Sequence, residues 1–243
     1  MNLIADIGNT SFKLALVEKG NFLRTERFHS VEEIIAFIER ESLSFEKVII
    51  SSVANTGTEL TDFLSERSGY IHILSAKSAF PFRINYDTPG TLGMDRLAAV
   101  AGAYNKYGNG NVLIIDAGTA ITYDLLTEGR YCGGAISPGI SMRFRALSTF
   151  TGRLPLVERG ICSGFPARST SDGINCGVVN GVVFEINRYI CEFKEKYPEP
   201  VTILTGGDSG YISERLSAKH VNDPDLVLKG LNYILEFNAE KNA

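Results

Sequence analysis

Apolar and polar residues follow one another along the chain in two patterns: short apolar runs, and apolar residues at helical spacing. The short runs predict strands at 2–7, 11–17, 22–28, 47–53 and 70–74. The helical spacing predicts helices at 30–41, 58–69, 94–107, 139–149, 169–197 and 223–238. Ser30 and Glu33 form a capping box at the first helix, and Asp223 is the predicted cap of the last. Because strands and helices alternate, the sequence predicts sheets covered by helices, an α/β fold.

Part of this pattern occurs twice. The stretch LIADIGNT at 3–10 aligns with LIIDAGTA at 113–120, so that Leu, Ile, Asp and Gly coincide. Each stretch is followed by a strand, a Lys-Gly or Glu-Gly turn and another strand, which predicts two related halves. The segment GNGN at 108–111 is the best linker, so we predict domains at 1–110 and 111–243, with the C-terminal helix free to pack back on the first. Small ligands often bind between domains.

The composition excludes several classes of protein. Of the 243 residues 44% are apolar, which is ordinary for a globular chain with a core. The net charge of −4 argues against a nucleic-acid partner held by bulk electrostatics. No apolar run approaches the roughly 18 residues of a membrane span, and Asp6 interrupts the place of a signal peptide's apolar region. We therefore expect a cytoplasmic protein without membrane or nucleic-acid partners.

The cysteines and histidines do not predict a metal or disulfide framework. The four cysteines, at 132, 162, 176 and 191, form no C-x-x-C pair, and the three histidines are far apart. This spacing argues against a zinc site and against a disulfide framework.

Candidate chemistry gathers where glycines and carboxylates follow predicted strands. The segments are Asp6–Thr10, Gly93–Arg96, Asp116–Thr119 and Leu204–Gly207. Glycine turns leave backbone N–H groups free to bind phosphate oxygens, and carboxylates beside phosphates make sense if they hold a cation. Asp6 alone would more often be a turn residue. Asp116 at the equivalent position of the repeat, together with Gly206–Gly207, favours a nucleotide site. No P-loop, dinucleotide fingerprint or G-x-S-x-G elbow occurs in the sequence.

Two positions allow both a structural and a functional interpretation. Asp95 and Arg96 fit an acidic helix start with a salt-bridged neighbour, and they also fit a hydroxyl-proton acceptor beside a guanidinium for an anionic substrate. Lys13 fits a side chain that extends from a strand edge to water, and its place after Asn9–Thr10 also fits a contact to phosphate.

Five motifs together resemble one enzyme family. In order and spacing, DIGNTSFK (6–13), GMDR (93–96), DAGTAIT (116–122), GGAISPG (133–139) and LTGGD (204–208) are similar to type III pantothenate kinases. The resemblance covers nearly the whole chain. It implies two duplicated α/β domains of the actin-like ATPase type, shared with the acetate and sugar kinases and Hsp70, with ATP bound in the interdomain cleft. It implies ATP-dependent phosphorylation of pantothenate to 4′-phosphopantothenate, the first step of coenzyme A synthesis.

The resemblance also implies roles for individual residues. The catalytic base is Asp95. ATP is bound by Asp6, Ile7, Gly8, Asn9, Thr10, Ser11, Phe12, Lys13 and Thr119. Pantothenate is contacted by Tyr86, Gly93, Met94, Asp95, Arg96 and Thr170. Asp6 is expected to organise Mg²⁺ through water, and Asp116 to bind a monovalent cation, K⁺ or NH₄⁺. The family usually has Asn before the threonine, whereas this chain has Ser169.

The resemblance further implies a homodimer with the long helix, 170–197, at its interface.

Two alternative functions remain open at this stage. One is another enzyme of the superfamily, such as a sugar kinase or a phosphatase, which would explain Asp6, Asp116 and the Gly-Gly turn but not GMDR preceded by Tyr86. The other is a non-catalytic regulator on the same scaffold, like the Bvg accessory factors. The presence of Asp6, Asp95 and Asp116 favours the kinase.

Overall fold

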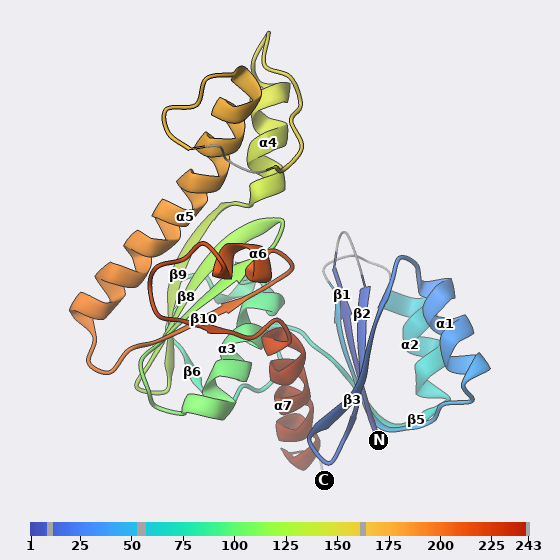
Figure 1. The fold of residues 1–243 in the computed structure, drawn as a ribbon. Coiled ribbons are helices and arrows are strands. Elements are labelled where there is room, and N and C mark those ends of the chain that lie inside the picture. Colours follow the sequence, from blue (N-terminus) through green and yellow to red (C-terminus); the bar gives the residue numbers. More distant parts are fainter. Residues whose placement is uncertain (9–11, 53–56, 161–163, 242–243) are drawn as a thin grey trace. The chain divides into compact units, whose positions relative to one another are not determined.

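The computed structural model describes residues 1–8, 12–52, 57–160 and 164–241, and these form two compact units (Figure 1). The first unit contains residues 1–106 and 226–243, and the second contains residues 107–225. The C-terminal segment thus belongs to the same compact unit as the N-terminus.

A five-stranded sheet is the centre of the first unit. Its strands are β1 (Asn2–Ile7), β2 (Phe12–Glu18), β3 (Asn21–Phe28), β4 (Phe45–Ser52) and β5 (Ser68–Ile73). Their order in the sheet is β3-β2-β1-β4-β5, with β1 antiparallel to β2 and parallel to β4. The chain order and the sheet order therefore differ, because β4 returns to the other side of β1 through a helix.

Helices cover both faces of this sheet. They are α1 (Val31–Arg40), α2 (Gly57–Ser65) and α7 (Leu226–Lys241), and a further helix of the unit, α3 (Met94–Tyr107), packs against α7. Leu3, Ala5 and Ile7 alternate along β1 and pack in one core with residues of α1 and α2. Since side chains alternate across a strand, Asn2 and Ile4 point to the opposite face. The helix α7 lies on that face against β1 and β4.

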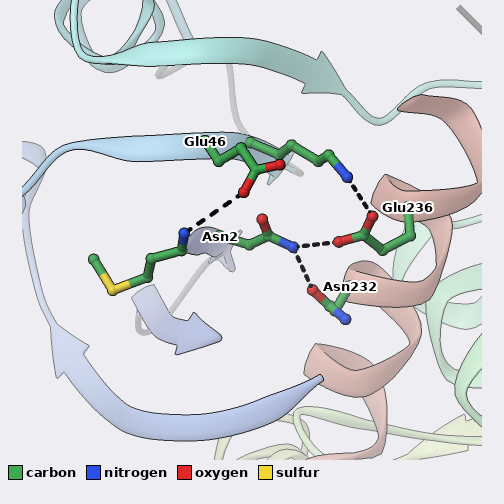
Figure 2. A network of polar contacts seen from close by, with 6 residues as sticks. Asn2, Glu46, Asn232 and Glu236 are labelled. Atoms are coloured by element: carbon green, nitrogen blue, oxygen red, sulfur yellow. Dashed lines mark hydrogen bonds and ion pairs between the residues drawn. The ribbon is translucent and has the colours of Figure 1, made fainter. Parts of the chain in front are cut away.

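A network of polar side chains fixes α7 to the ends of β1 and β4 (Figure 2). Asn2 Nδ2 donates to Glu236 Oε1 at 2.6 Å and to Asn232 Oδ1 at 3.2 Å. Lys47 Nζ pairs with Glu236 Oε2 at 2.5 Å. Burial alone would raise the pKa of Glu236, but the hydrogen bonds from Lys47 and Asn2 outweigh it and lower this pKa. The carboxylate is thus held ionised where the terminal helix meets the sheet.

Two glycines let α3 and α7 pack backbone to backbone. A Cβ on Gly230 would lie 1.8 Å from Ala98 O, and one on Gly102 would lie 2.4 Å from Leu226 O. No side chain fits at either position, so the distance between these helices depends on both glycines.

The second unit repeats the design of the first. Its strands are β7 (Val112–Ala117), β8 (Ala120–Thr127), β9 (Arg130–Pro138), β10 (Val201–Thr205) and β11 (Val221–Asn222), in the order β9-β8-β7-β10-β11. Its helices are α4 (Ile140–Thr149), α5 (Thr170–Lys196) and α6 (Ser209–Ser213), which pack in one core with Leu113, Ile115 and Leu204 of the sheet.

The hairpins of the two units match in detail. Lys19 and Gly20 have φ of 48° and 80°, and Glu128 and Gly129 have φ of 51° and 69°. These are left-handed conformations at both central residues of a two-residue turn, the geometry that suits a twisted hairpin. The matching strand orders and turns show the duplication that the sequence predicts.

Most of the predicted elements are confirmed, but several boundaries were wrong. Helix α2 ends at Ser65 rather than at residue 69, because Ser68 and Gly69 already pair with β4 in β5. Helix α7 begins at Leu226 rather than next to Asp223, because the Asp223 N–H donates to Leu204 O beside the short β11. The predicted cap of α1 is confirmed by the Ser30 Oγ, which accepts from the Glu33 N–H at 3.2 Å.

The cysteines depart from the expectation at one position. The thiols of Cys132 and Cys191 are free, whereas Cys176 is disulfide-bonded. The general expectation of reduced thiols is therefore wrong at Cys176, whereas one cross-link is not the disulfide framework that the spacing argues against. A single cross-link does not need the regular cysteine spacing that marks a disulfide framework, so the sequence pattern did not indicate it.

We predict that Gly230→Ala lowers the free energy of unfolding by about 2–4 kcal/mol, because the added methyl meets the backbone of α3 and the helices must separate. Chemical denaturation followed by circular dichroism measures this change. The control is Gly173→Ala in α5, where a Cβ meets nothing within 4 Å. There alanine should be neutral or stabilise by up to about 1 kcal/mol. Equal effects at the two positions would contradict the packing argument.

Candidate functional site

The first cluster of candidate residues forms at the carboxyl end of β1. Asp6 is opposite Lys13 in the antiparallel pair with β2, and opposite Ser51 in the parallel pair with β4. Gly8 follows the strand, and the predicted phosphate contacts Asn9, Thr10 and Ser11 lie outside the described residues. The register thus brings one carboxylate, one amine and one hydroxyl to neighbouring positions.

Asp6 has a perturbed titration. Its pKa is raised from 3.8 to about 6. Burial is the largest cause of this rise, the positive charge of Lys13 opposes it, and the negative charge of Asp95 adds to it. The influence of Asp95 shows that the two predicted carboxylates are close enough to interact within the first unit. A half-buried carboxylate with this pKa favours a bound cation, which would replace the lost hydration.

The start of α3 presents the predicted catalytic residue. A Cβ on Gly93 would lie 2.4 Å from Asp95 Oδ1, so glycine leaves room for that carboxylate. Asp95 Oδ1 also accepts from the Arg96 N–H at 2.8 Å. The Asp95 side chain is exposed, whereas Arg96 is buried with 6% of its surface accessible. Asp95 is therefore held by the first turn of a helix and open to a substrate.

The other predicted substrate contacts of this unit lie near that turn in the chain. Met94 is the first residue of α3 and is half-buried, as is Gly93. Tyr86 is half-buried between the short strand β6 (Arg83–Ile84) and a 3₁₀ turn at Pro89–Thr91.

The second cluster forms at the corresponding end of β7. A Cβ on Gly206 would lie 2.3 Å from Asp116 Oδ1 and 2.5 Å from Ala117 O, and Gly206 has φ of +95°. The turn after β10 therefore contacts Asp116 directly, and only glycine allows this approach. The Asp208 N–H donates to Ala117 O at 2.9 Å, which ties the same turn to the end of β7.

The corner between β9 and α4 contacts the same turn region. A Cβ on Gly139 would lie 2.2 Å from Gly118 O, and the Gly139 N–H donates to Thr119 O at 3.0 Å. The Thr119 side chain is exposed. Asp116, Gly118, Thr119, Gly139 and Gly206 are thus brought together, as a nucleotide or cation site requires.

Thr170 lies elsewhere in the second unit, as the first residue of α5. Ser169, which stands where the resembling family usually has Asn, caps this helix: its Oγ accepts from the Asp172 N–H at 3.1 Å. Serine and asparagine are both good caps, so the replacement preserves the start of the helix. The Thr170 side chain is exposed.

Sequence reasoning missed some contacts of these clusters. Ser51 was not proposed, although its position at the end of a strand parallel to β1 could have indicated it. Arg159, which pairs with Asp208 at 2.6 Å, was not proposed as a site residue. No sequence signal pairs residues 49 positions apart, so this contact depended on the structure.

The clusters contain few metal ligands. In the part of the chain that the structure describes, no three His, Cys, Asp or Glu side chains converge as a metal site. A magnesium ion at Asp6 would therefore take most of its ligands from water and phosphate, which is how Mg²⁺ is commonly bound beside nucleotides.

We predict that Asp6→Asn stabilises the ligand-free protein by about 1–2 kcal/mol at pH 7.5, because it removes a buried charge. Since the folded-state pKa is raised, the wild-type carboxyl stabilises the fold most below pH 4, and that stability is lost as the pH rises through 6. Urea denaturation at pH 7.5 and pH 4 should show the advantage of the variant only at the higher pH. The exposed Asp62→Asn is the control, and a pH-independent gain would contradict the interpretation.

Comparison with known proteins identifies the family. The sequence profile of the type III pantothenate kinases matches residues 2–192. Type III pantothenate kinases from Christiangramia forsetii and Porphyromonas gingivalis are each 41% identical to this chain, over 98% of it and 99% of theirs. The enzyme from Flavobacterium johnsoniae is 35% identical over the full length of both chains.

Solved structures support the fold. A protein named as a Baf family transcriptional activator from Campylobacter jejuni matches with a TM-score of 0.65 and 22% identity, over 98% of this chain and 99% of that one. A protein named as a 2-dehydro-3-deoxygalactonokinase from Sinorhizobium meliloti matches with a TM-score of 0.61 and 13% identity, over 100% and 99%. These matches confirm the actin-like kinase fold, and on the sequence matches the chain belongs to the type III pantothenate kinase family.

Proposed function

We propose that the chain carries out its family's reaction with Asp95 as the base and the two strand-end clusters as the nucleotide and cation sites. The reaction is the ATP-dependent phosphorylation of pantothenate to 4′-phosphopantothenate, at the start of coenzyme A synthesis. The observation that carries the proposal is the electrostatic interaction of Asp6 with Asp95. It places the strand end proposed to bind phosphate near an exposed carboxylate of the same unit.

Asp95 acts on the hydroxyl group of pantothenate. An aspartate is a weak base for an alcohol, but the transition state of phosphoryl transfer is loose, so the proton can leave late. Asp95 therefore orients the hydroxyl and accepts its proton as the new bond forms. Its exposure at the start of α3 supports this role, since a substrate can reach it.

Residues 6–13 hold the phosphates of ATP. Backbone N–H groups after Gly8 and the Lys13 amine are suited to phosphate oxygens, and Asp6 holds Mg²⁺ through water. A magnesium ion in this place neutralises charge on the phosphates. The raised pKa of Asp6 supports the assignment, because the carboxylate has lost hydration that a hydrated cation can replace.

Asp116 and its surroundings suit a monovalent cation, K⁺ or NH₄⁺. The Asp116 carboxylate and the Ala117 carbonyl both lie against Gly206, so two oxygen donors face the same space. Hard cations prefer such oxygen ligands. Thr119, in the adjoining turn, contacts ATP in this proposal.

The remaining predicted residues bind pantothenate. Tyr86, Gly93, Met94 and Arg96 lie in the first unit around the start of α3, and Thr170 lies at the start of α5 in the second. The Arg96 guanidinium is assigned to the carboxylate of pantothenate, since arginine binds carboxylates in a bidentate fashion.

The setting of the enzyme completes the proposal. No helix in the described part of the chain is long and apolar enough to cross a membrane. The cytoplasm is the proposed location, and no membrane or nucleic-acid partner is part of the proposal.

We predict that Asp95→Asn lowers kcat by about 10²–10⁴-fold, because the hydroxyl loses its proton acceptor. A coupled assay of ADP release with ATP, Mg²⁺ and pantothenate measures this, with potassium present or replaced by sodium. Asp62→Asn, on the exposed surface of α2, is the matched control and should keep full activity.

The same assay separates the alternatives. No turnover by a folded wild-type protein that binds ATP would reject the kinase and favour the regulator. Turnover with another alcohol would preserve the fold and the carboxylates but reject the assignments of Tyr86 and Arg96.

We further propose that the protein is a homodimer with α5 at the interface. Phe184 in α5 is 69% exposed and lies two helical turns after Gly177 on the same face of the helix. In the described part of the chain, a Cβ on Gly177 would meet nothing within 4 Å, and one on Gly181 would meet Arg143 Nη1 at 3.9 Å. A second copy of the chain would cover this apolar and glycine-containing face.

We predict that Phe184→Glu converts the dimer to a monomer, because it places a charge in an apolar interface. Light scattering coupled to size-exclusion chromatography measures the mass. Leu23→Glu is the matched control, since Leu23 is 58% exposed on β3 in the first unit. A wild-type monomer, or a dimer that survives Phe184→Glu, would contradict the proposed interface.

A further inference from the structure

One arginine outside both clusters, Arg159, connects two separate parts of the second unit. It lies in the irregular segment between α4 and α5, and its guanidinium donates to Asp208 Oδ1 at 2.6 Å. The next residue, Gly160, donates its N–H to Asn175 Oδ1 at 2.9 Å. Asn175 is 94% buried in α5, since only 6% of its surface is accessible. Residues 159–160 thus join the first turns of α5 to the start of α6.

The ion pair between Arg159 and Asp208 matters because Asp208 directly follows the glycine turn after β10. Asp208 directly follows Gly206–Gly207, and its N–H donates to Ala117 O beside Asp116. Its side chain makes no capping bond to α6, so the carboxylate is committed to Arg159 rather than to its own helix. The glycines before it have no side chains with which to fix the turn, and Asp208 is their first side-chain anchor.

Aromatic packing holds the same arginine in place. The Arg159 guanidinium carbon lies 4.3 Å from the centre of the Tyr211 ring, and that of Arg215 lies 3.6 Å from it. Both distances are within the range of a cation–π contact. Arg159 therefore has a defined orientation, although its side chain is 41% accessible.

The other arginines of this region have different roles or surroundings. Arg143 donates to Pro138 O and to Ser137 Oγ and pairs with Glu185, so it holds the β9–α4 corner to α5. Arg153, in the same irregular segment as Arg159, is exposed. Among these arginines, the contact to the turn after β10 belongs to Arg159.

We propose that Arg159 is a positioning residue for nucleotide binding, acting through Asp208 on the Gly206–Gly207 turn. This inference rests on the proposed function and on the interpretation of Gly206–Gly207, beside Asp116 at the end of β7, as part of the nucleotide site. Without the ion pair, the turn keeps its backbone bond to Ala117 but loses its side-chain anchor, so part of the binding energy goes into ordering it. Pantothenate binding, assigned to other residues, should be unaffected.

The test uses the whole chain, four single variants and one double variant. Arg159→Gln and Asp208→Asn each remove one partner of the pair, Arg159→Lys keeps the charge, and Arg153→Gln is the matched control. We expect Arg159→Gln and Asp208→Asn to raise KM for ATP by about 3–10-fold, with kcat and KM for pantothenate within about 2-fold. The double variant should be no worse than either single one, because both remove the same interaction.

Arg159→Lys should recover part of the affinity, since lysine keeps the ion pair but packs differently on Tyr211. The Arg153→Gln control should match the wild type. An unchanged KM for ATP in Arg159→Gln would overturn the inference. An equal rise in both KM values together with a lower melting temperature would also overturn it, because that is the result of a merely structural role.

Binding measurements keep this inference separate from the proposed reaction. Calorimetric titration with Mg·ADP needs no turnover, and the same 3–10-fold loss of affinity is expected for Arg159→Gln. If the wild type binds Mg·ADP but does not phosphorylate pantothenate, the proposed function fails while the role of Arg159 is still tested by the titration. Equal affinities of wild type and Arg159→Gln would reject the positioning role whatever the activity.

Discussion

The site residues of the first unit gather around the Asp6 carboxylate at the end of β1, and the constraint on them is the cost of keeping this carboxylate partly out of water. Its side chain is largely removed from water, which raises its pKa to about 6 and makes the ionised form costly in the ligand-free protein. The sheet register brings Lys13 and Ser51 beside it, and α3 brings Asp95 within electrostatic reach. The unit thus maintains a carboxylate that is destabilising in the ligand-free protein, and in the proposed function a cation and phosphates bind there, which is the usual conflict between stability and function.

In the second unit, glycines pack against the corresponding strand end. Asp116 occupies the equivalent strand end, and Gly206 approaches it so closely that a Cβ there would lie 2.3 Å from Asp116 Oδ1. Gly139 in turn lets the start of α4 approach Gly118 and Thr119. The same strand-end arrangement therefore occurs in two versions. The first unit has a carboxylate beside an amine in the sheet register, and the second has a carboxylate beside a glycine turn.

Close backbone contacts recur wherever two elements must be held at one distance. Gly102 and Gly230 set the separation of α3 and α7, and the polar network of Asn2, Lys47 and Glu236 fixes the end of that helix. As a result, α3 packs against a helix that is anchored to the sheet carrying Asp6. The first turn of α3 contains Asp95, the catalytic candidate. The terminal helix therefore contributes to the geometry of the site without supplying a residue to it.

The sequence by itself determined the element types, the duplication and the candidate residues, because short motifs such as DIGNT and GMDR depend on local backbone chemistry. It also determined the caps at Ser30 and Ser169 and the two hairpin turns, which involve neighbours only. Only the tertiary structure decided the start of α7, the burial of Arg96 and the pairing of Arg159 with Asp208. These features depend on contacts between residues far apart in the chain, and no local pattern records such contacts.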